Sequence, residues 1–227
     1  MYHIMNNIIK IKKQITELSN KYSREKDSIT LLAVTKTRSI EEIKETIKTG
    51  QKDFAENYLQ EALNKINTIN NPNVTWHFIG HIQTNKCKKI AKNFSWVHSV
   101  DSFTIAKKLN DYRPTDLPKL NICIEVKLEK NPQKSGVAPS ESLPLCQSIM
   151  QLPNLKLRGL MIIPEPSPNL NSQRAKFREL AELQKKLQSN GIALDTLSMG
   201  MSDDYEAAIA EGATIIRIGR AIFGEKT

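Results

Sequence analysis

The sequence has few cysteines and no long apolar run. Its 227 residues include three cysteines, Cys87, Cys123 and Cys146, which are odd in number and far apart. This pattern argues against a disulfide framework and against a zinc knuckle, so we expect a reducing, cytoplasmic environment. No stretch approaches the roughly 20 apolar residues that a membrane-spanning helix requires. Lysines at positions 10, 12 and 13 interrupt the N-terminal apolar residues, so we also expect no signal peptide.

Clusters that mark metal sites, nucleophilic catalysis or nucleic-acid binding are also missing from the sequence. His77 and His81 are four residues apart, but they flank Gly80 at an expected strand end, where helical ligand spacing does not apply. No Ser/His/Asp nucleophile motif is present. The net charge is +9, yet the lysines are spread along the chain and no basic block contains interleaved aromatic residues. We therefore favour a lysine-rich surface over a nucleic-acid face, and expect no metal.

A regular alternation of strand and helix patterns is what the sequence does contain. Residues 4–26 carry the apolar stripe of one amphipathic helix. Further helix starts are marked by Ser39 with Glu42, which form a capping box, and by Asp101 or Ser102. Short apolar runs between the helical segments predict strands over residues 30–36, 53–55, 75–79, 95–100, 121–127, 157–163, 196–198 and 215–219.

Eight strand–helix units with short connections imply a parallel sheet, and closing that sheet into a barrel removes its edges. No linker, repeat or change in composition marks a second domain. We therefore predict an α/β fold, a single (β/α)₈ TIM barrel over residues 1–227. Residues 1–28 are expected to form an additional helix that packs on the barrel.

The first expected strand runs directly into a lysine. Residues 31–35 are a short apolar run, and Lys36 follows at the end where α/β proteins place their sites. An ammonium group is costly inside a buried sheet. Lys36 therefore either lies at the mouth of the barrel and reaches water, or forms a Schiff base there.

Two glycine-containing loops follow the seventh and eighth expected strands. Residues 198–202 and 219–224 both run into helix N-termini, where backbone N–H groups can bind a phosphate. The alternative is that Gly200 and Gly219 serve only the tight turns. Asp203 and Asp204 would repel a phosphate. If Asp203 and Glu206 instead form a helix cap and the acids turn outward, Ser202 and backbone groups can bind the phosphate.

Strand alternation predicts charged side chains inside the barrel. Arg217 lies between two isoleucines of the eighth strand and should face the interior, where a guanidinium needs an acceptor. Glu125 is one candidate acceptor, and a ring nitrogen of a ligand is the other. Glu125 and Lys127 share a face of the fifth strand, so we predict an internal ion pair between them.

These features converge on one type of ligand. It has an aldehyde for Lys36, a phosphate for the two glycine loops, and a ring atom for Arg217. Pyridoxal 5′-phosphate (PLP) has all three, and arginine is one known partner of its ring nitrogen.

The sequence resembles the YggS/PROSC family of PLP homeostasis proteins along nearly its whole length. The matching segments are residues 33–37 (AVTKT), 56–58 (ENY), 76–80 (WHFIG), 98–102 (HSVDS), 134–136 (KSG), 158–161 (RGLM), 197–204 (LSMGMSDD), 217–219 (RIG) and 222–224 (IFG). The resemblance implies a barrel like the N-terminal domain of alanine racemase and a Schiff base on Lys36. It also implies that the further cofactor-binding residues are Asn57, Met199, Ser202, Arg217, Gly219 and Arg220.

Some positions depart from the family's usual pattern. Glu125 and Lys127 replace Gln and Asn, Arg220 stands where Thr is common, Phe54-Ala55 replaces Phe-Gly, and Arg38-Ser39 replaces Lys-Pro. The Arg220 change leaves open whether that residue contacts phosphate through its backbone alone or through its guanidinium as well.

The resemblance also bears on catalysis. In alanine racemase the second base is a tyrosine delivered by an added β domain, and we expect that domain to be absent because the sequence ends at Thr227. Tyr58 and Tyr205 lie near the expected mouth, but nothing marks either as a base. We therefore predict a monomeric, non-catalytic PLP-binding protein that buffers PLP or delivers it to PLP-dependent apoenzymes. The alternative is an amino-acid racemase or a related PLP enzyme.

Overall fold

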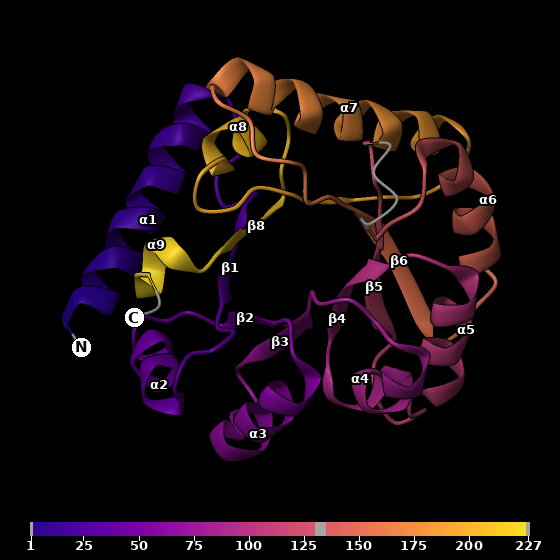
Figure 1. The fold of residues 1–227 in the computed structure, drawn as a ribbon, viewed down its shortest axis with the longest axis horizontal. Coiled ribbons are helices and arrows are strands. Elements are labelled where there is room, and N and C mark those ends of the chain that lie inside the picture. Colours follow the sequence, from indigo (N-terminus) through magenta and orange to yellow (C-terminus); the bar gives the residue numbers. More distant parts are fainter. Residues whose placement is uncertain (1, 130–134, 226–227) are drawn as a thin grey trace.

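Eight parallel strands close into a barrel in chain order (Figure 1). The computed structural model describes residues 2–129 and 135–225. The last strand pairs with the first, with Leu32 beside Arg217, so the barrel closes between the two ends of the chain. The strands are β1 (Thr30–Val34), β2 (Asp53–Glu56), β3 (Thr75–Phe78), β4 (Trp96–Val100), β5 (Leu120–Glu125), β6 (Leu155–Met161), β7 (Thr196–Ser198) and β8 (Ile215–Ile218). The predicted (β/α)₈ fold is confirmed.

Helices surround the barrel, as Figure 1 shows. They are α1 (Tyr2–Lys21), α2 (Ile40–Lys48), α3 (Leu59–Ile69), the 3₁₀ turn η1 (Thr84–Lys86), α4 (Cys87–Asn93), α5 (Phe103–Tyr112), α6 (Pro139–Ile149), α7 (Leu170–Ser189), α8 (Tyr205–Ala210) and α9 (Arg220–Phe223). No helix within the described residues is both long and apolar enough to cross a bilayer.

The additional helix α1 packs on the barrel through its apolar stripe. Ile4, Ile8 and Ile11 are buried in the main hydrophobic core. Asn7 Nδ2 donates to the carbonyl of Ile222 in α9 at 2.9 Å, which ties the two ends of the chain together. The helix ends at Lys21, five residues before the predicted end, because the chain then turns toward β1.

Helix starts follow the predicted chemistry at two places. Ser39 and Glu42 form the predicted capping box at α2. Of the two residues proposed to cap α5, it is Ser102 whose hydroxyl accepts from the backbone N–H of Ile105. Side-chain acceptors at these positions satisfy N–H groups that have no partner within the helix.

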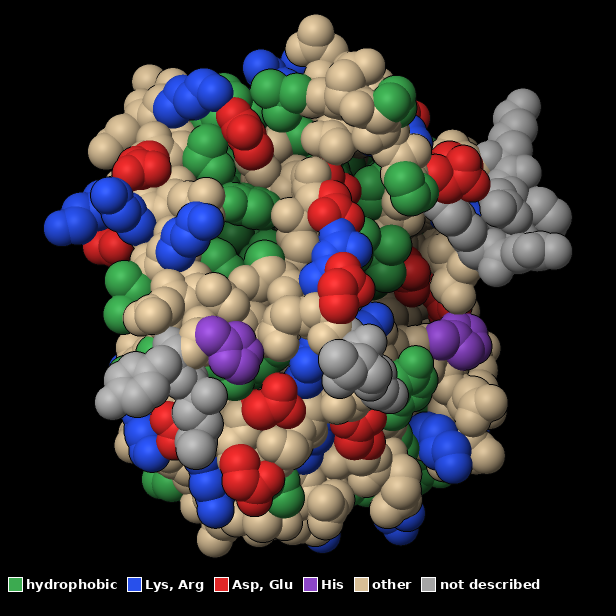
Figure 2. Space-filling model, turned by 60° about the vertical axis from the view of Figure 1, so that its left-hand side comes forward, with side chains coloured by type: hydrophobic (Ala, Val, Ile, Leu, Met, Phe, Trp, Pro, Cys, Tyr) green, Lys and Arg blue, Asp and Glu red, His purple; other side chains and the backbone are tan. Residues whose placement is uncertain are grey.

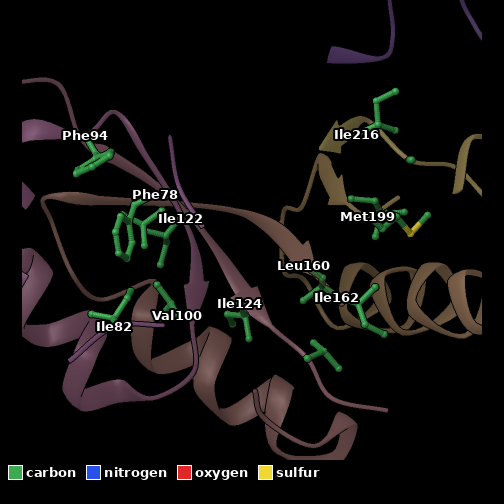
Figure 3. Close-up of a cluster of buried hydrophobic side chains, with 14 of the residues drawn as sticks. Phe78, Ile82, Phe94, Val100, Ile122, Ile124, Leu160, Ile162, Met199 and Ile216 are labelled. Carbon is green, nitrogen blue, oxygen red and sulfur yellow. The ribbon is translucent and has the colours of Figure 1, made fainter. Parts of the chain in front are cut away.

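The alternation of side chains sorts each strand into an outward and an inward face. Outward residues such as Ile122, Ile124 and Ile216 form the main core between strands and helices, part of which Figure 3 shows. A smaller inner cluster fills the barrel and contains Leu32, Val34, Ala55, Ile79 and Ile215. Leu32 and Val34 point inward, and Lys36 follows two residues after the end of this strand.

Positive and negative side chains are mixed on the surface in Figure 2. Lys and Arg residues lie among Asp and Glu residues on this face, rather than gathered in a single basic patch. Local ion pairs account for part of this mixing, for example Lys21 with Glu206 at 2.8 Å.

Candidate functional site

A cavity of about 390 Å³ opens at the carboxyl ends of the strands. This is the end at which parallel barrels place their active sites, and the volume lies in the range of small-molecule sites. Each residue predicted to bind the cofactor lines this cavity, with the exception of Met199. The full lining is Val34, Lys36, Asn57, Ile79, Ile163, Met201, Ser202, Asp203, Arg217, Gly219 and Arg220.

Lys36 lies at the mouth of the barrel, in a tight turn that follows β1. The backbone N–H of Arg38 donates to the carbonyl of Thr35 at 3.0 Å and closes the turn. Thr37, its third residue, has φ of 64°, the left-handed value that a type II turn requires at this position. The Lys36 side chain is exposed and lines the cavity. The structure therefore places this amine at the mouth, the position that both predicted alternatives require.

Arg217 is buried on the barrel side of β8, as the alternation predicts. Its guanidinium donates to Ser198 O at 2.6 Å, to Ser198 Oγ at 2.8 Å and to Ile162 O at 2.8 Å. Burial lowers the pKa of Arg217 to about 10. Glu125, the protein candidate of the two predicted acceptors, is not among these partners, because main-chain carbonyls and Ser198 take that role.

The predicted ion pair between Glu125 and Lys127 is also not formed among the described residues. Burial raises the pKa of Glu125 to about 7, with a further contribution from the nearby negative charge of Asp101. β5 ends at Glu125, after which Val126 bridges to Val137 and Lys127 N–H donates to Val137 O at 3.0 Å. Strand alternation therefore no longer sets the direction of Lys127.

A chain of buried polar side chains leads from Arg217 across the barrel, and the sequence analysis missed it. His98 Nδ1 lies 2.7 Å from Ser198 Oγ, and its Nε2 lies 3.0 Å from His77 Nδ1. His77 Nε2 lies 3.2 Å from Asp53 Oδ1 at the opposite end. The only indication of this chain in the sequence is that His77 and His98 both lie within expected strands.

The two residues at the ends of this series of hydrogen bonds, Arg217 and Asp53, determine which imidazole nitrogens carry hydrogens. Burial lowers the pKa of both imidazoles, that of His98 well below its usual value, which favours the neutral form of each ring. Arg217 can only donate and an ionised Asp53 can only accept. We therefore assign a hydrogen to Nε2 of each histidine, with every hydrogen bond directed from Arg217 toward Asp53.

The two glycine loops meet beside Lys36. The backbone N–H of Ala221, after β8, donates to Ser202 Oγ, after β7, at 3.2 Å. Gly200 has φ of 93°, and a Cβ there would lie 2.6 Å from Ala208 Cβ, so this turn requires glycine. At Gly219 an added Cβ would lie 3.3 Å from the carbonyl oxygen of Val34. Both glycines thus serve tight packing, and Gly219 also lines the cavity.

The acids after β7 do not form the predicted helix cap. Asp203 pairs with Arg220, so the two charges at the mouth neutralise each other. Asp204 Oδ1 accepts from Met201 N–H at 2.6 Å, while Glu206 accepts from Lys21 Nζ at 2.8 Å. Proximity of Asp203 to Arg220, rather than helix capping, fixes the carboxylate.

Asn57 and Met199 differ in their relation to the cavity. Asn57 Oδ1 is a buried atom without a hydrogen-bond partner, in a residue that lines the cavity. The Met199 side chain is fully buried in the main core, near Ile216 in Figure 3, and is not part of the lining. Lys134 of the matching segment 134–136 lies outside the described residues.

Another cavity, of about 680 Å³, lies at the other end of the barrel. It separates α1 from the starts of β1 and β2, and its lining includes Lys12, Lys26, Lys52 and Asp53. It contains none of the residues predicted to bind a cofactor. We place the site at the smaller cavity because that one combines Lys36 with Arg217 and both glycine loops.

Comparison with known sequences identifies the family of this chain. A family model described as alanine racemase, N-terminal domain, matches residues 7–227. The chain is 48% identical over 226 residues to the pyridoxal phosphate homeostasis protein of Pseudomonas aeruginosa, covering all of this chain and 97% of that protein. It is 42% identical over 229 residues to the protein of the same name from Escherichia coli K12, covering all of this chain and 98% of that protein.

Known structures give the same relationship. PipY of Synechococcus elongatus, solved with PLP bound, matches with a TM-score of 0.86 at 32% identity, covering 97% of this chain and all of PipY. Alanine racemase of Clostridium difficile shares the fold, with a TM-score of 0.76 at 16% identity, covering all of this chain and 57% of that enzyme. This chain belongs to the family of pyridoxal phosphate homeostasis proteins, which is built on the fold of the alanine racemase N-terminal domain.

Proposed function

We propose that this protein binds PLP through a Schiff base on Lys36 and takes part in PLP homeostasis. The observation that carries the proposal is the single cavity that combines the Lys36 amine, the Arg217 guanidinium and both glycine loops. When bound, PLP would supply an aldehyde to the Lys36 amine, and formation of the Schiff base would release the aldehyde oxygen as water.

The residues present fit the other parts of PLP. Arg217 uses two of its nitrogens on protein acceptors, which leaves N–H groups for the ring nitrogen. Asn57 Oδ1 is buried without a partner, so the side chain has an unused acceptor at the cavity. For the phosphate we propose Ser202, Gly219 and the backbone of Arg220, since Asp203 already pairs with the Arg220 guanidinium. The buried Met199 side chain is left out of these contacts.

A carrier is favoured over an enzyme by the tyrosines near the mouth. Tyr205 Oη bonds to Gln14 Oε1 at 3.1 Å, against α1, and this residue does not line the cavity. Tyr58 is 57% exposed in an adjoining cavity that it shares with Lys36. A racemase needs a second base held on the far face of the substrate, and neither tyrosine supplies one in this arrangement. The exposed Lys36 suits exchange of PLP with apoenzyme acceptors. We also propose that the protein is a monomer, which sedimentation would test.

The visible spectrum of the purified protein tests the proposal. We expect wild-type protein mixed with PLP to develop an absorption band that borohydride shifts, and Lys36→Ala to lack it. Lys26→Ala is the matched control, because Lys26 is also an exposed lysine but lines the cavity at the other end of the barrel. A band retained in Lys36→Ala would move the Schiff base to another lysine.

Exchange of an amino acid's α-proton with solvent deuterium separates the carrier from the racemase. We expect the PLP-loaded protein to leave the α-proton of common amino acids in place. Exchange that requires PLP and is lost in Lys36→Ala would establish the enzyme instead.

A further inference from the structure

A triad of charged residues, two of them buried and one partly exposed, lies on the outer side of the barrel wall, directly behind Lys36. Lys65 of α3 is 3% exposed, and its Nζ donates to Glu56 Oε1 at 2.7 Å and to Glu61 Oε1 at 2.6 Å. Glu56, at the end of β2, is completely buried. Burial of an ion pair usually adds little net stability, since desolvation offsets the attraction. The triad therefore invites an explanation other than stability.

The triad bonds to the backbone on both sides of Lys36. Lys65 Nζ donates to the carbonyl of Thr35 at 2.6 Å, which belongs to the peptide group before Lys36. Glu61 Oε1 accepts from the N–H of Thr37 at 2.5 Å, which belongs to the peptide group after it. The two peptide groups that carry the Lys36 Cα are thus held by one network of charges.

The turn needs such support because its conformation is unfavourable. Thr37 is β-branched and has φ of 64°, a region that side chains of this type rarely adopt. The turn itself has one backbone hydrogen bond, from Arg38 to Thr35. The charge-assisted hydrogen bond that Thr37 N–H donates to the Glu61 carboxylate supplies additional stabilisation at the strained residue.

We infer that Lys65, Glu56 and Glu61 are positioning residues for Lys36, which hold its amine at the geometry needed to attack the PLP aldehyde. This inference rests on the proposed function of Lys36. The triad touches neither the cavity nor the amine, and acts through the backbone of the turn. Its expected effect is therefore on the rate of Schiff-base formation rather than on the capture of PLP.

Two variants at Glu61 test the inference, because this side chain is partly exposed at the start of α3. Glu61→Gln keeps an oxygen that can accept from Thr37 and Lys65, whereas Glu61→Ala removes it. We mix each apo protein with increasing PLP and follow the visible band. The rate constant at saturating PLP should fall about tenfold in Glu61→Ala and stay near wild type in Glu61→Gln. The PLP concentration at half-maximal rate should change little in either.

The double variant Glu56→Gln with Lys65→Met provides a second test, since it removes the ion pair without leaving a lone buried charge. This double variant should also slow Schiff-base formation. A third measurement uses Glu61→Ala without PLP, in which amide hydrogen exchange at Thr37 should be faster than in the wild type. Variants that lose thermal stability but form the Schiff base at the wild-type rate would overturn the positioning role. A band that survives in Lys36→Ala would instead show that the proposed function, on which this inference rests, has the wrong lysine.

Discussion

A carboxyl group inside the barrel makes the stability of this protein depend on pH. Glu125 lies at the end of β5, on the inner face, and is nearly completely buried. Burial and the charge of Asp101 raise its pKa to about 7, while Arg217 acts in the opposite direction. Around neutral pH this side chain is thus balanced between its protonated and ionised forms.

We predict that Glu125→Gln stabilises the protein at pH 8 but not at pH 5. An unfolded glutamate releases its proton near pH 4.3 and the folded one near pH 7, so in this interval the folded state binds more protons. The free energy of unfolding must therefore fall as pH rises through this window. We expect a fall of about 1–3 kcal/mol relative to Glu125→Gln, measured by denaturant titration. Glu17→Gln, at an exposed site, is the control, and parallel wild-type and Glu125→Gln curves would refute the prediction.

Strand periodicity determines which face a residue occupies but not its partners. The two-residue period of a strand correctly predicts that Arg217 and Glu125 lie inside the barrel and that their isoleucine neighbours lie outside it. It could not show that the carbonyls of Ile162 and Ser198 accept from Arg217, since backbone groups carry no sequence signal. Nor could it link His77 to His98, which depends on the stagger between neighbouring strands. Lys127 was misplaced because the period ends with the strand.

At the scale of secondary-structure elements, the close approach of the β2–α3 and β3–η1 connections shapes the cavity. Gly80 follows β3, and a Cβ there would lie 2.0 Å from the carbonyl oxygen of Asn57. The Asn57 oxygen belongs to the backbone, and a Cβ is fixed in place by the backbone of its own residue, so only a shift of one connection against the other can make room. Since Asn57 lines the cavity, such a shift changes the site.

We predict that Gly80→Ala destabilises the protein by about 1–3 kcal/mol and weakens PLP binding. The expected cause is displacement of Asn57, so the loss of affinity should be seen in PLP titrations as well as in thermal unfolding. Gly191→Ala is the control, because an added Cβ meets nothing within 4 Å there and the residue has φ of 82°. It should lose about 1 kcal/mol of stability through backbone strain alone and bind PLP normally. Unchanged PLP affinity in Gly80→Ala would contradict the role given to Asn57.

Elements are predicted well where composition and periodicity act together. Helix α1 and the three residues of β7 lie close to their predicted positions, although α1 ends five residues early. Strand ends are less accurate, because pairing with neighbours decides where a strand stops. β5 ends two residues early, where Val126 bridges to Val137 instead. The predicted cap between β7 and α8 is absent for a similar reason, since Asp203 pairs with Arg220, the first residue of the distant helix α9.

At the scale of the whole molecule, the candidate site lies across the seam of the barrel. Lys36 follows β1 and Asn57 follows β2, whereas Ser202 follows β7 and Gly219 follows β8. β1 and β8 are paired directly, from Thr30 with Ile215 to Ala33 with Ile218. A ligand held by all four connections therefore links the first quarter of the barrel to the last. Opening of the barrel at this seam would break the site.

We predict that PLP stabilises the protein and protects this seam in particular. At a free PLP concentration of 100 times Kd, binding adds about 2.7 kcal/mol, which for a chain of this size raises Tm by about 5–10 °C. Amide hydrogen exchange should slow in β1 and β8 more than in β4 and β5, which lie on the opposite side of the barrel (Figure 1). In Lys36→Ala both effects should be much smaller. Equal protection of all eight strands would mean that PLP stabilises the barrel globally, without a specific link across the seam where the two ends of the chain meet.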